Sequence, residues 1–401
     1  MNSDSEIRSL TGLRGIAALY VVVFHFFIGL QFTNPFTILL AHGYLAVDVF
    51  FVLSGFVMTL TYHHLFEDGY SLPGNLRFLA KRLARVYPLY FVGSICALFL
   101  IRLGLLEPPH LKLSLAFVWN LLMVQAWGLT ESLDGPGWSI SAEWAAYLLF
   151  PVLLLVFIES RPGRWLGALL SIGALIFLVR MPEAHAHAIT SEAILDIHDS
   201  RYALPVLRCV SEFVLGMLAY KISTMPVGLR FAQRAKIHDV LAVAIVVLLT
   251  RPSTDLLIPC LIPLLLVGLA SGHSVTARVL SSGPLETAGR YSYSIYMIHT
   301  LLYGLLGWIH RSVNSLGLHH GQTFGAFAGM VMTIPLAALA YHLIERPGRS
   351  FIRNLLDSQK KSPGLLPALT MAPLSFEAAN PAPAVLAEPL ISSQGTQDGN
   401  L

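Results

Sequence analysis

The chain has 401 residues, of which 55% are hydrophobic and only 12% are charged, and its mean hydropathy is +0.65. These values exclude a soluble globular protein of ordinary composition and indicate an integral membrane protein. The formal net charge of +3 is too small to predict nucleic-acid binding, and the three cysteines, an odd number, predict no disulfide framework.

The first apolar run, residues 10–30, is long enough to cross a bilayer as a helix and contains Arg14 and His25. Three helical turns separate these two residues, so they share one face and lie about 16 Å apart along the axis. A charged side chain that faces lipid costs about 3 kcal/mol or more. We therefore expect both side chains to face a protein-lined interior, which predicts a polar site within the membrane.

Further apolar runs of spanning length follow and bring the total to ten. They are predicted at about residues 43–62, 86–103, 140–158, 164–180, 204–222, 238–249, 256–271, 291–309 and 323–344. The weaker run 113–128 favours an interfacial or re-entrant segment, and an eleventh span there stays open. The predicted fold is an all-α integral membrane protein of about ten transmembrane helices with a polar site between them.

The distribution of lysine and arginine predicts the orientation of the chain. If the end of the first span that holds Arg14 is cytoplasmic, most of the 26 basic residues lie on the cytoplasmic side. Both termini are then expected to be cytoplasmic. We expect residues 1–350 to form the membrane domain. Residues 351–401, rich in proline, alanine, serine and glutamine, are expected to form a disordered tail.

Asp48 lies near the outer end of the second span, at about the same depth as His25 in the first. A carboxylate beside an imidazole fixes the tautomer and increases the basicity that general-base catalysis requires. We therefore expect Asp48 to orient His25. The alternative is a structural hydrogen bond that joins the two helices.

A basic cluster precedes the third span in the stretch RFLAKRLARVYPLY. Arg82 and Arg85 lie three residues apart on one helical face, with Arg77 and Lys81 beside them at the cytoplasmic surface. Guanidinium groups match phosphate oxygens, so this cluster is typical of a site for a nucleotide-linked carrier such as coenzyme A. The alternative is that these residues only anchor the chain at lipid headgroups.

Two later stretches also place polar residues at or inside spans. The stretch DGPGWSISAEWAAYLLFP carries Trp138, Ser139, Ser141 and Glu143, and a glutamate one turn into a span has no role in an aromatic belt. The stretch GRYSYSIYMIH places three residues on one helical face, namely Tyr293, Tyr296 and His299, and IERP follows with Glu345 and Arg346.

A cluster of histidine and aspartate in a predicted loop could suggest a metal site. Its members are His185, His187, Asp196, His198 and Asp199. Their spacing matches no metal-binding motif, so we predict no metal.

Six motifs occur along the chain in a fixed order, from about residue 10 to residue 347: LRGIAALYVVVFHF, VDVFFVLSGF, RLARVYPLY, GWSISAEW, GRYSYSIYMIH and IERP. In this set and order the chain resembles the family-3 membrane acyltransferases. The resemblance implies a ten-helix fold that takes an acyl group, commonly acetyl, from cytoplasmic acyl-coenzyme A. It also implies delivery of that group to a hydroxyl of a cell-surface glycan or a related molecule.

The resemblance also implies roles for individual residues. His25 matches the essential histidine of the family, Arg14 the arginine paired with it, and Asp48 the acidic residue of the second span. Arg82 and Arg85 match the paired arginines that face the acyl donor. Some relatives carry a further span and a Ser-Gly-Asn-His hydrolase-like domain, which nothing after residue 344 here could form, so we expect the short, stand-alone type.

These observations predict an acyl-CoA-dependent O-acyltransferase of a bacterial inner membrane that modifies a surface or exported glycan or a lipid-linked saccharide. The expected catalytic residues are His25, Asp48, Arg14 and Glu143. The donor site is expected at Arg82 and Arg85, and the acceptor site at Trp138, Ser139, Ser141, Tyr293 and His299. An acyl-histidine intermediate stays open. The alternative function is a secondary transporter in which His25, Asp48 and Arg14 relay protons and substrate, although the chain shows no internal repeat.

Overall fold

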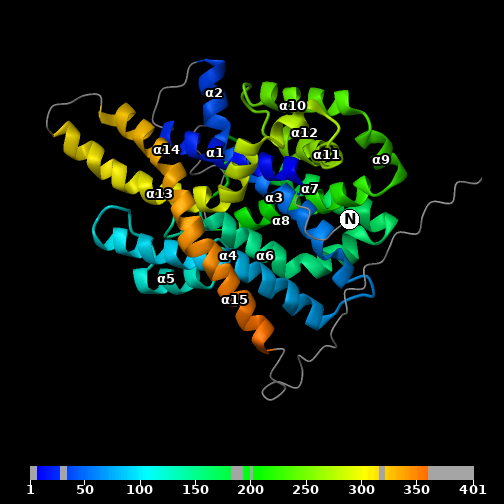
Figure 1. The fold of residues 1–401 in the computed structure, drawn as a ribbon, viewed down its shortest axis with the longest axis horizontal. Coiled ribbons are helices and arrows are strands. Elements are labelled where there is room, and N and C mark those ends of the chain that lie inside the picture. Colours follow the sequence, from blue (N-terminus) through cyan, green and yellow to red (C-terminus); the bar gives the residue numbers. More distant parts are fainter. Residues whose placement is uncertain (1–6, 28–33, 182–192, 199–201, 316–320, 360–401) are drawn as a thin grey trace, which may run out of the picture.

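The computed structural model describes residues 7–27, 34–181, 193–198, 202–315 and 321–359, and these residues form helices and no strand. The predicted all-α class is therefore confirmed for this part of the chain. Figure 1 shows α13 and α14 side by side, and α15 passing along α4. The helices are α1 Arg8–Phe27, α2 Pro35–Ala41, α3 Ala46–Tyr62, α4 Leu72–Arg102, α5 Leu113–Leu121, α6 Gly137–Leu153, α7 Arg161–Arg180, α8 Leu204–Ser223, α9 Pro226–Ala232, α10 Ala235–Leu248, α11 Leu257–Ser271, α12 Val275–Leu280, α13 Gly283–Asn314, α14 Gly321–Ala340 and α15 Arg346–Gln359.

Short irregular turns connect or extend several of these helices. Two are 3-10 turns, η1 (His42–Leu45) and η2 (His63–Leu65), and two are π turns, η3 (Leu154–Ile158) and η5 (Tyr341–Glu345). As a result α2, η1, α3 and η2 form one continuous helical stretch, and α14, η5 and α15 form another.

Six segments of the described residues are long and apolar enough to cross a membrane, fewer than the ten predicted. They are Arg8–Phe27, Pro35–Leu65, Leu72–Arg102, Gly137–Ile158, Arg161–Arg180 and Gly325–Leu355. Part of the difference has a simple cause. The helices α10 and α11 have 14 and 15 residues, about 21 and 22 Å, which is short of a 30 Å hydrocarbon core. The helix α8 is long enough but carries three charged residues, Arg208, Glu212 and Lys221.

The run 113–128 does not cross as one helix, because α5 has only nine residues and is about 13.5 Å long. The third predicted span also differs from the structure. It was expected to begin at residue 86, but α4 begins at Leu72, where Ser71 caps it by accepting a hydrogen bond from the backbone N–H of Gly74 at 3.2 Å. Basic residues lower the hydropathy of this stretch without lowering its helix propensity. The arginine cluster is therefore part of the same helix as the apolar run.

Two closely packed helix pairs position the polar residues of the interior. An added Cβ at Gly55 of α3 would lie 1.9 Å from the carbonyl oxygen of Phe213 in α8, and one at Gly289 of α13 would lie 1.9 Å from the carbonyl oxygen of Thr11 in α1. Glycine at these crossings lets the two backbones touch, as is common between membrane helices. The pairs α1 with α13 and α3 with α8 thereby fix which side chains can meet.

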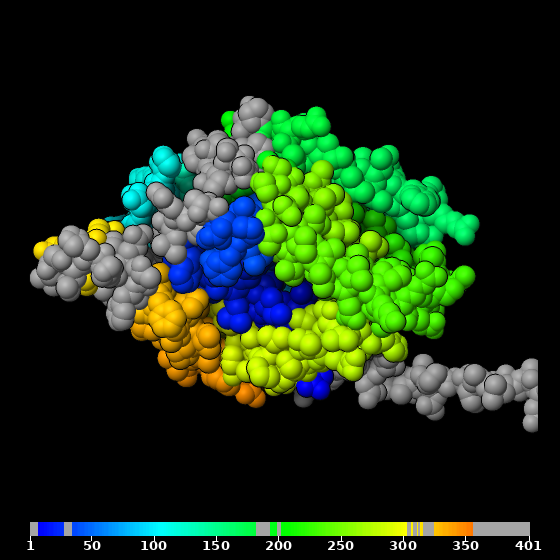
Figure 2. All heavy atoms as spheres, turned by 90° about the horizontal axis from the view of Figure 1, so that it is seen from above, coloured from blue at the N-terminus to red at the C-terminus, as the bar shows by residue number. Residues whose placement is uncertain are grey.

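The helix α1 reaches one surface of the molecule. Figure 2 shows α1 (dark blue) on this face between α2 (blue) and α12 with the start of α13 (yellow-green), in agreement with their contacts. The predicted tail is only partly visible, since α15 extends past residue 350 to Gln359 and residues 360–401 lie outside the described residues.

Candidate active site

Two histidine rings meet between α1 and α13. Nδ1 of His25 lies 3.3 Å from Nε2 of His299, and the ring centroids are 4.8 Å apart. Each Nδ1 also contacts a backbone carbonyl of its own helix, Val21 at 3.0 Å for His25 and Tyr296 at 2.6 Å for His299. A carbonyl oxygen only accepts hydrogen bonds, so both Nδ1 atoms carry the proton in the neutral rings. Nε2 of His25 is therefore the basic nitrogen, and Nε2 of His299 can accept from Nδ1 of His25.

Asp48 does not contact His25. Its two carboxylate oxygens accept hydrogen bonds from Arg208 of α8, Oδ2 from Nη2 at 2.6 Å and Oδ1 from Nε at 3.2 Å. Glu212, one turn further along α8, lies 3.4 Å from Nε of the same guanidinium. All three side chains are buried. The prediction that Asp48 orients His25 is therefore wrong. Both carboxylate oxygens of Asp48 bind Arg208 instead.

The N-terminal end of α6 contributes residues of the predicted acceptor site. Ser139 Oγ donates to the carbonyl of Pro136 at 3.0 Å and lies 2.7 Å from the hydroxyl of Tyr296, one turn before His299. The Trp138 ring is surrounded by three groups at centroid distances of 5.9 to 6.5 Å, namely the guanidinium of Arg208, the Phe51 ring and the His198 ring. Trp138 and Ser139 therefore lie beside the Arg208 ion pair, on the same side as Tyr296.

Two other predicted acceptor residues make contacts that hold the fold. Ser141 Oγ accepts from the backbone N–H of Ala126 at 3.1 Å, and its carbonyl accepts from Nε1 of Trp127 at 3.0 Å. The hydroxyl of Tyr293 donates to the carbonyl of Val86 in α4 at 2.7 Å. These bonds join the loop before α6 to α6, and α13 to α4.

The other end of α1 carries a second group of charges. Nη2 of Arg14 donates to Ser292 Oγ at 3.1 Å, so Arg14 and His25 both face α13, as their spacing predicted. Two residues further along α13, Ser294 donates to Glu345 at 2.7 Å. Glu345 interacts electrostatically with three arginines, Arg85, Arg14 and Arg349. One buried carboxylate thus stands among three guanidinium groups.

Arg82 does not lie on the surface as a phosphate site would require. Only 9% of it is exposed, and its guanidinium lies 5.2 Å from the centroid of the Tyr147 ring. Glu143 interacts electrostatically with both Arg82 and Tyr147. Arg85, one turn further along α4, is half-buried and lies nearer to Glu345. The expected pair is therefore split: Arg82 belongs to the protein interior with Glu143, and Arg85 to the arginine group around Glu345.

A buried acid in the loop before α6 also borders α13. Oδ1 of Asp134 accepts from the hydroxyl of Thr300, the residue after His299, at 2.7 Å. Oδ2 has no hydrogen-bond partner among the described residues, and only 2% of Asp134 is exposed. Burial raises the pKa of this carboxyl from 3.8 to about 7, although the Thr300 hydrogen bond opposes the rise.

The sequence analysis did not single out Arg208 and Glu212. The sequence nevertheless marks them, because they lie four residues apart in an otherwise apolar run. Charged side chains are unfavourable in lipid, so such a pair predicts a shared partner in the protein interior. No group of three or more potential metal ligands occurs among the described residues, while His185, His187 and Asp199 lie outside them.

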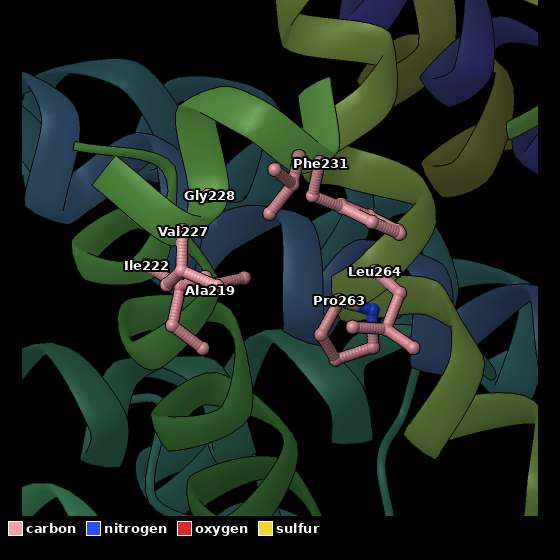
Figure 3. Close-up of a pocket in the computed structure, with 8 residues that line it drawn as sticks. Ala219, Ile222, Val227, Gly228, Phe231, Pro263 and Leu264 are labelled. Atoms are coloured by element: carbon pink, nitrogen blue, oxygen red, sulfur yellow. The ribbon is translucent and has the colours of Figure 1, made fainter. Parts of the chain in front are cut away.

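A cavity of about 230 Å³ lies away from these polar groups, between α8, α9 and α11 (Figure 3). Its lining is entirely apolar and includes Ala219, Phe231 and Leu264. Ala219 lies three turns along α8 from Arg208, or about 16 Å. The cavity offers no group for acid–base chemistry, so the polar interior is the better candidate for an active site.

Comparisons with known proteins place the chain among acyltransferases. A family model described as an acyltransferase domain matches residues 7–342. Acyltransferase MdmB of Streptomyces mycarofaciens is 29% identical over 373 residues, which cover 85% of this chain and 91% of that protein. Two relatives are 24% identical over 86% and 87% of this chain: "Putative peptidoglycan O-acetyltransferase YrhL" of Bacillus subtilis and O-acetyltransferase OatA of Staphylococcus aureus. The matches span 55% and 58% of the length of these two proteins.

Proposed function

Because the chain belongs to the acyltransferase family whose model matches residues 7–342, we propose that it is a membrane O-acyltransferase. The proposed donor is cytoplasmic acyl-coenzyme A, with acetyl as the first acyl group to test. The proposed acceptor is a hydroxyl of a surface or exported glycan, or of a lipid-linked saccharide. The proposed location is a bacterial inner membrane, with about ten crossings and both termini cytoplasmic.

The observation that carries the proposal is the imidazole pair of His25 and His299. In the proposed step, Nε2 of His25 takes the proton of the acceptor hydroxyl while the hydroxyl oxygen attacks the thioester carbonyl. The new C–O bond forms, the C–S bond breaks, and the departing coenzyme A thiolate receives the proton from the imidazolium. His299 supports this step by accepting from Nδ1 of His25, which keeps Nε2 available as the base.

The group of arginines around Glu345 supports an anionic donor. Arg14, Arg85 and Arg349 bring three positive charges to the surroundings of the Glu345 carboxylate. Guanidinium groups bind phosphate oxygens with matched geometry, and coenzyme A carries several phosphates. This group lies at the end of α1 opposite to His25, so we propose that the phosphates bind there and that the acyl thioester reaches inward.

The names of the relatives support the class of acceptor. YrhL is named a peptidoglycan O-acetyltransferase and OatA an O-acetyltransferase, so a carbohydrate hydroxyl is the natural candidate here. Trp138, with its ring beside Arg208 and His198, offers an aromatic face at the outer end of α6. We propose that the acceptor binds next to this ring.

The proposal is tested with purified protein and labelled acetyl-coenzyme A, in the presence of a surface-glycan extract from the source cells. We expect release of free coenzyme A together with label in the glycan. Uptake of label into proteoliposomes without release of coenzyme A would instead support a transporter that uses His25, Asp48 and Arg14. Analysis of surface glycans from a deletion strain then identifies the acceptor.

A further inference from the structure

Residues 193–198, between α7 and α8, carry a second carboxylate–imidazole pair. Oδ1 of Asp196 lies 3.1 Å from Nδ1 of His198. The Asp196 side chain is 6% exposed, whereas the His198 side chain is 38% exposed. The pair therefore runs from the protein interior toward the surface.

A hydrogen bond at Leu195 connects this segment to residues that pack beside His25. The backbone N–H of Leu195 donates to Oδ2 of the buried Asp255 at 3.1 Å, and the Tyr44 hydroxyl donates to the same oxygen. The Tyr44 ring packs on Phe24 with centroids 6.0 Å apart, and the Phe24 ring packs edge-on against His25 at 4.9 Å. Asp255 and Tyr44 thus hold Leu195 on the side of α1 that carries His25.

The other anchor is the Arg208 ion pair. Nη1 of Arg208 donates to the carbonyl of Ile197 at 3.5 Å, and the His198 ring lies 6.5 Å from the ring of Trp138. Leu195 and Ile197 are buried in the core, so the segment is held on both sides of Asp196. The carboxylate of Asp196 then acts electrostatically on both His25 and Arg208.

Asp48 does not support the charge of His25, because both of its carboxylate oxygens bind Arg208. We propose that Asp196 is the carboxylate that stabilises protonated His25 during acyl transfer, and that His198 holds Asp196 in position. Asp196 is thus a positioning residue that acts through His25. The inference rests on the proposed function, since protonated His25 arises only when it takes the proton of the acceptor hydroxyl.

Other charged groups around His25 are compatible with this role. His299 contacts His25 directly, and its Nδ1 is already bonded to a carbonyl. Arg208 on α8 is paired with Asp48, and His198 acts electrostatically on His25 in the direction opposite to Asp196. A carboxylate favours the protonated form of a neighbouring imidazole, by about 10- to 1000-fold in its protonation equilibrium where the two groups are about 4 to 6 Å apart. Loss of that charge should therefore reduce the rate of the step in which the imidazolium forms.

The test compares Asp196→Asn, Asp196→Glu and His198→Gln in the purified full-length protein. We expect Asp196→Asn to lower kcat for acetyl transfer by about 10- to 100-fold with the KM for acetyl-coenzyme A unchanged. Asp196→Glu should recover most of the rate because it keeps the charge, and His198→Gln should lose several-fold. Glu131→Gln is the matched control, since Glu131 also pairs with a histidine, His110, at 2.7 Å, in the loop before α6.

The outcomes separate this inference from the proposed function. A wild-type protein that transfers no acyl group would refute the proposed function. An active wild type with Asp196→Asn within twofold of its kcat would overturn only the role of Asp196. Equal losses in Asp196→Asn and Asp196→Glu would also overturn it, because packing rather than charge would then be the cause. If Asp196→Asn does not fold, the comparison of Asp196→Glu with His198→Gln decides: a His198→Gln rate equal to wild type counts against the inference.

Discussion

Nδ1 of His25 and Nε2 of His299 lie 3.3 Å apart where α1 crosses α13, while the Nδ1 atom of each ring faces a backbone carbonyl. This arrangement uses one imidazole as the base and the other as its hydrogen-bond acceptor. In the serine hydrolase triad the acceptor behind the histidine is a carboxylate. Here a neutral ring occupies that position, so the charge that supports an imidazolium has to come from another residue.

His25→Ala is expected to abolish acyl transfer without loss of the fold. Removal of a general base typically costs about 100- to 10,000-fold in rate. The measurement is acceptor acylation normalised to folded, membrane-inserted protein. His273→Ala, which changes an exposed histidine between α11 and α12, is the matched control. Near-normal transfer by His25→Ala would refute the proposed mechanism.

His299→Phe is expected to lower kcat by about 10- to 100-fold, because the ring keeps its packing but no longer accepts from Nδ1 of His25. The two residues act as a unit, so adding His299→Phe to His25→Ala should cause little further loss. A double-mutant cycle on kcat measures this coupling. Additive losses would show that His299 acts independently, for example on the acceptor.

The sequence predicted which residues lie in the interior better than which residues pair. Arg14, His25 and Asp48 were expected inside the protein because lipid penalises charge; each contacts a neighbouring helix, Asp48 is fully buried, and Arg14 and His25 are partly buried. Depth along a helix fixes only one coordinate of a side chain, however. The rotation of α3 against α8, set by glycine contacts such as Gly55, determines that Asp48 meets Arg208. No pattern within a single span contains that information.

The pattern of apolar residues also could not predict helix boundaries or individual hydrogen bonds. Arg82 was expected to share a surface with Arg85, yet α4 turns it toward Tyr147. Tyr293 was expected to bind substrate, but it bonds to the carbonyl of Val86. Both outcomes depend on a neighbouring helix that is remote in sequence. Glu143 stays a predicted site residue, now with Arg82 and Tyr147 as its electrostatic neighbours.

Asp48→Asn is expected to destabilise the protein rather than only slow the reaction. Removing one partner of a buried ion pair typically costs about 3 to 5 kcal/mol, because the other charge stays buried without compensation. Thermal unfolding in detergent measures the effect, and Arg208→Met in the Asp48→Asn background should recover part of the loss. Glu67→Gln is the control, since its surface pair with His63 is worth less than about 1 kcal/mol. An unchanged melting temperature for Asp48→Asn would contradict the role of the pair.

Arg85→Ala and Arg349→Ala are each expected to raise the KM for acyl-coenzyme A by about 10- to 100-fold. A charge-assisted contact with a phosphate contributes about 1.5 to 3 kcal/mol. Arg82→Ala should instead lower stability, because its guanidinium packs on Tyr147. Arg230→Ala, at an exposed site on α9, is the control. Unchanged KM and kcat in both Arg85→Ala and Arg349→Ala would leave these arginines as topology anchors.

Asp134 is expected to make the stability of the protein depend on pH. Burial raises its folded-state pKa to about 7 from an ordinary value of 3.8, so the folded protein favours the protonated acid. The stability that the protonated Asp134 contributes to the folded state is fully present below about pH 4 and is lost as the pH rises through 7. The total loss is roughly 4 kcal/mol, at about 1.4 kcal/mol per pH unit. Asp134→Asn cannot ionise, so it should be more stable than the wild type at pH 8, by a difference that falls to about 2 kcal/mol at pH 5 and vanishes below about pH 4. Melting temperatures measured from pH 5 to pH 9 test this, and parallel curves for the two proteins would show that Asp134 does not titrate in this range.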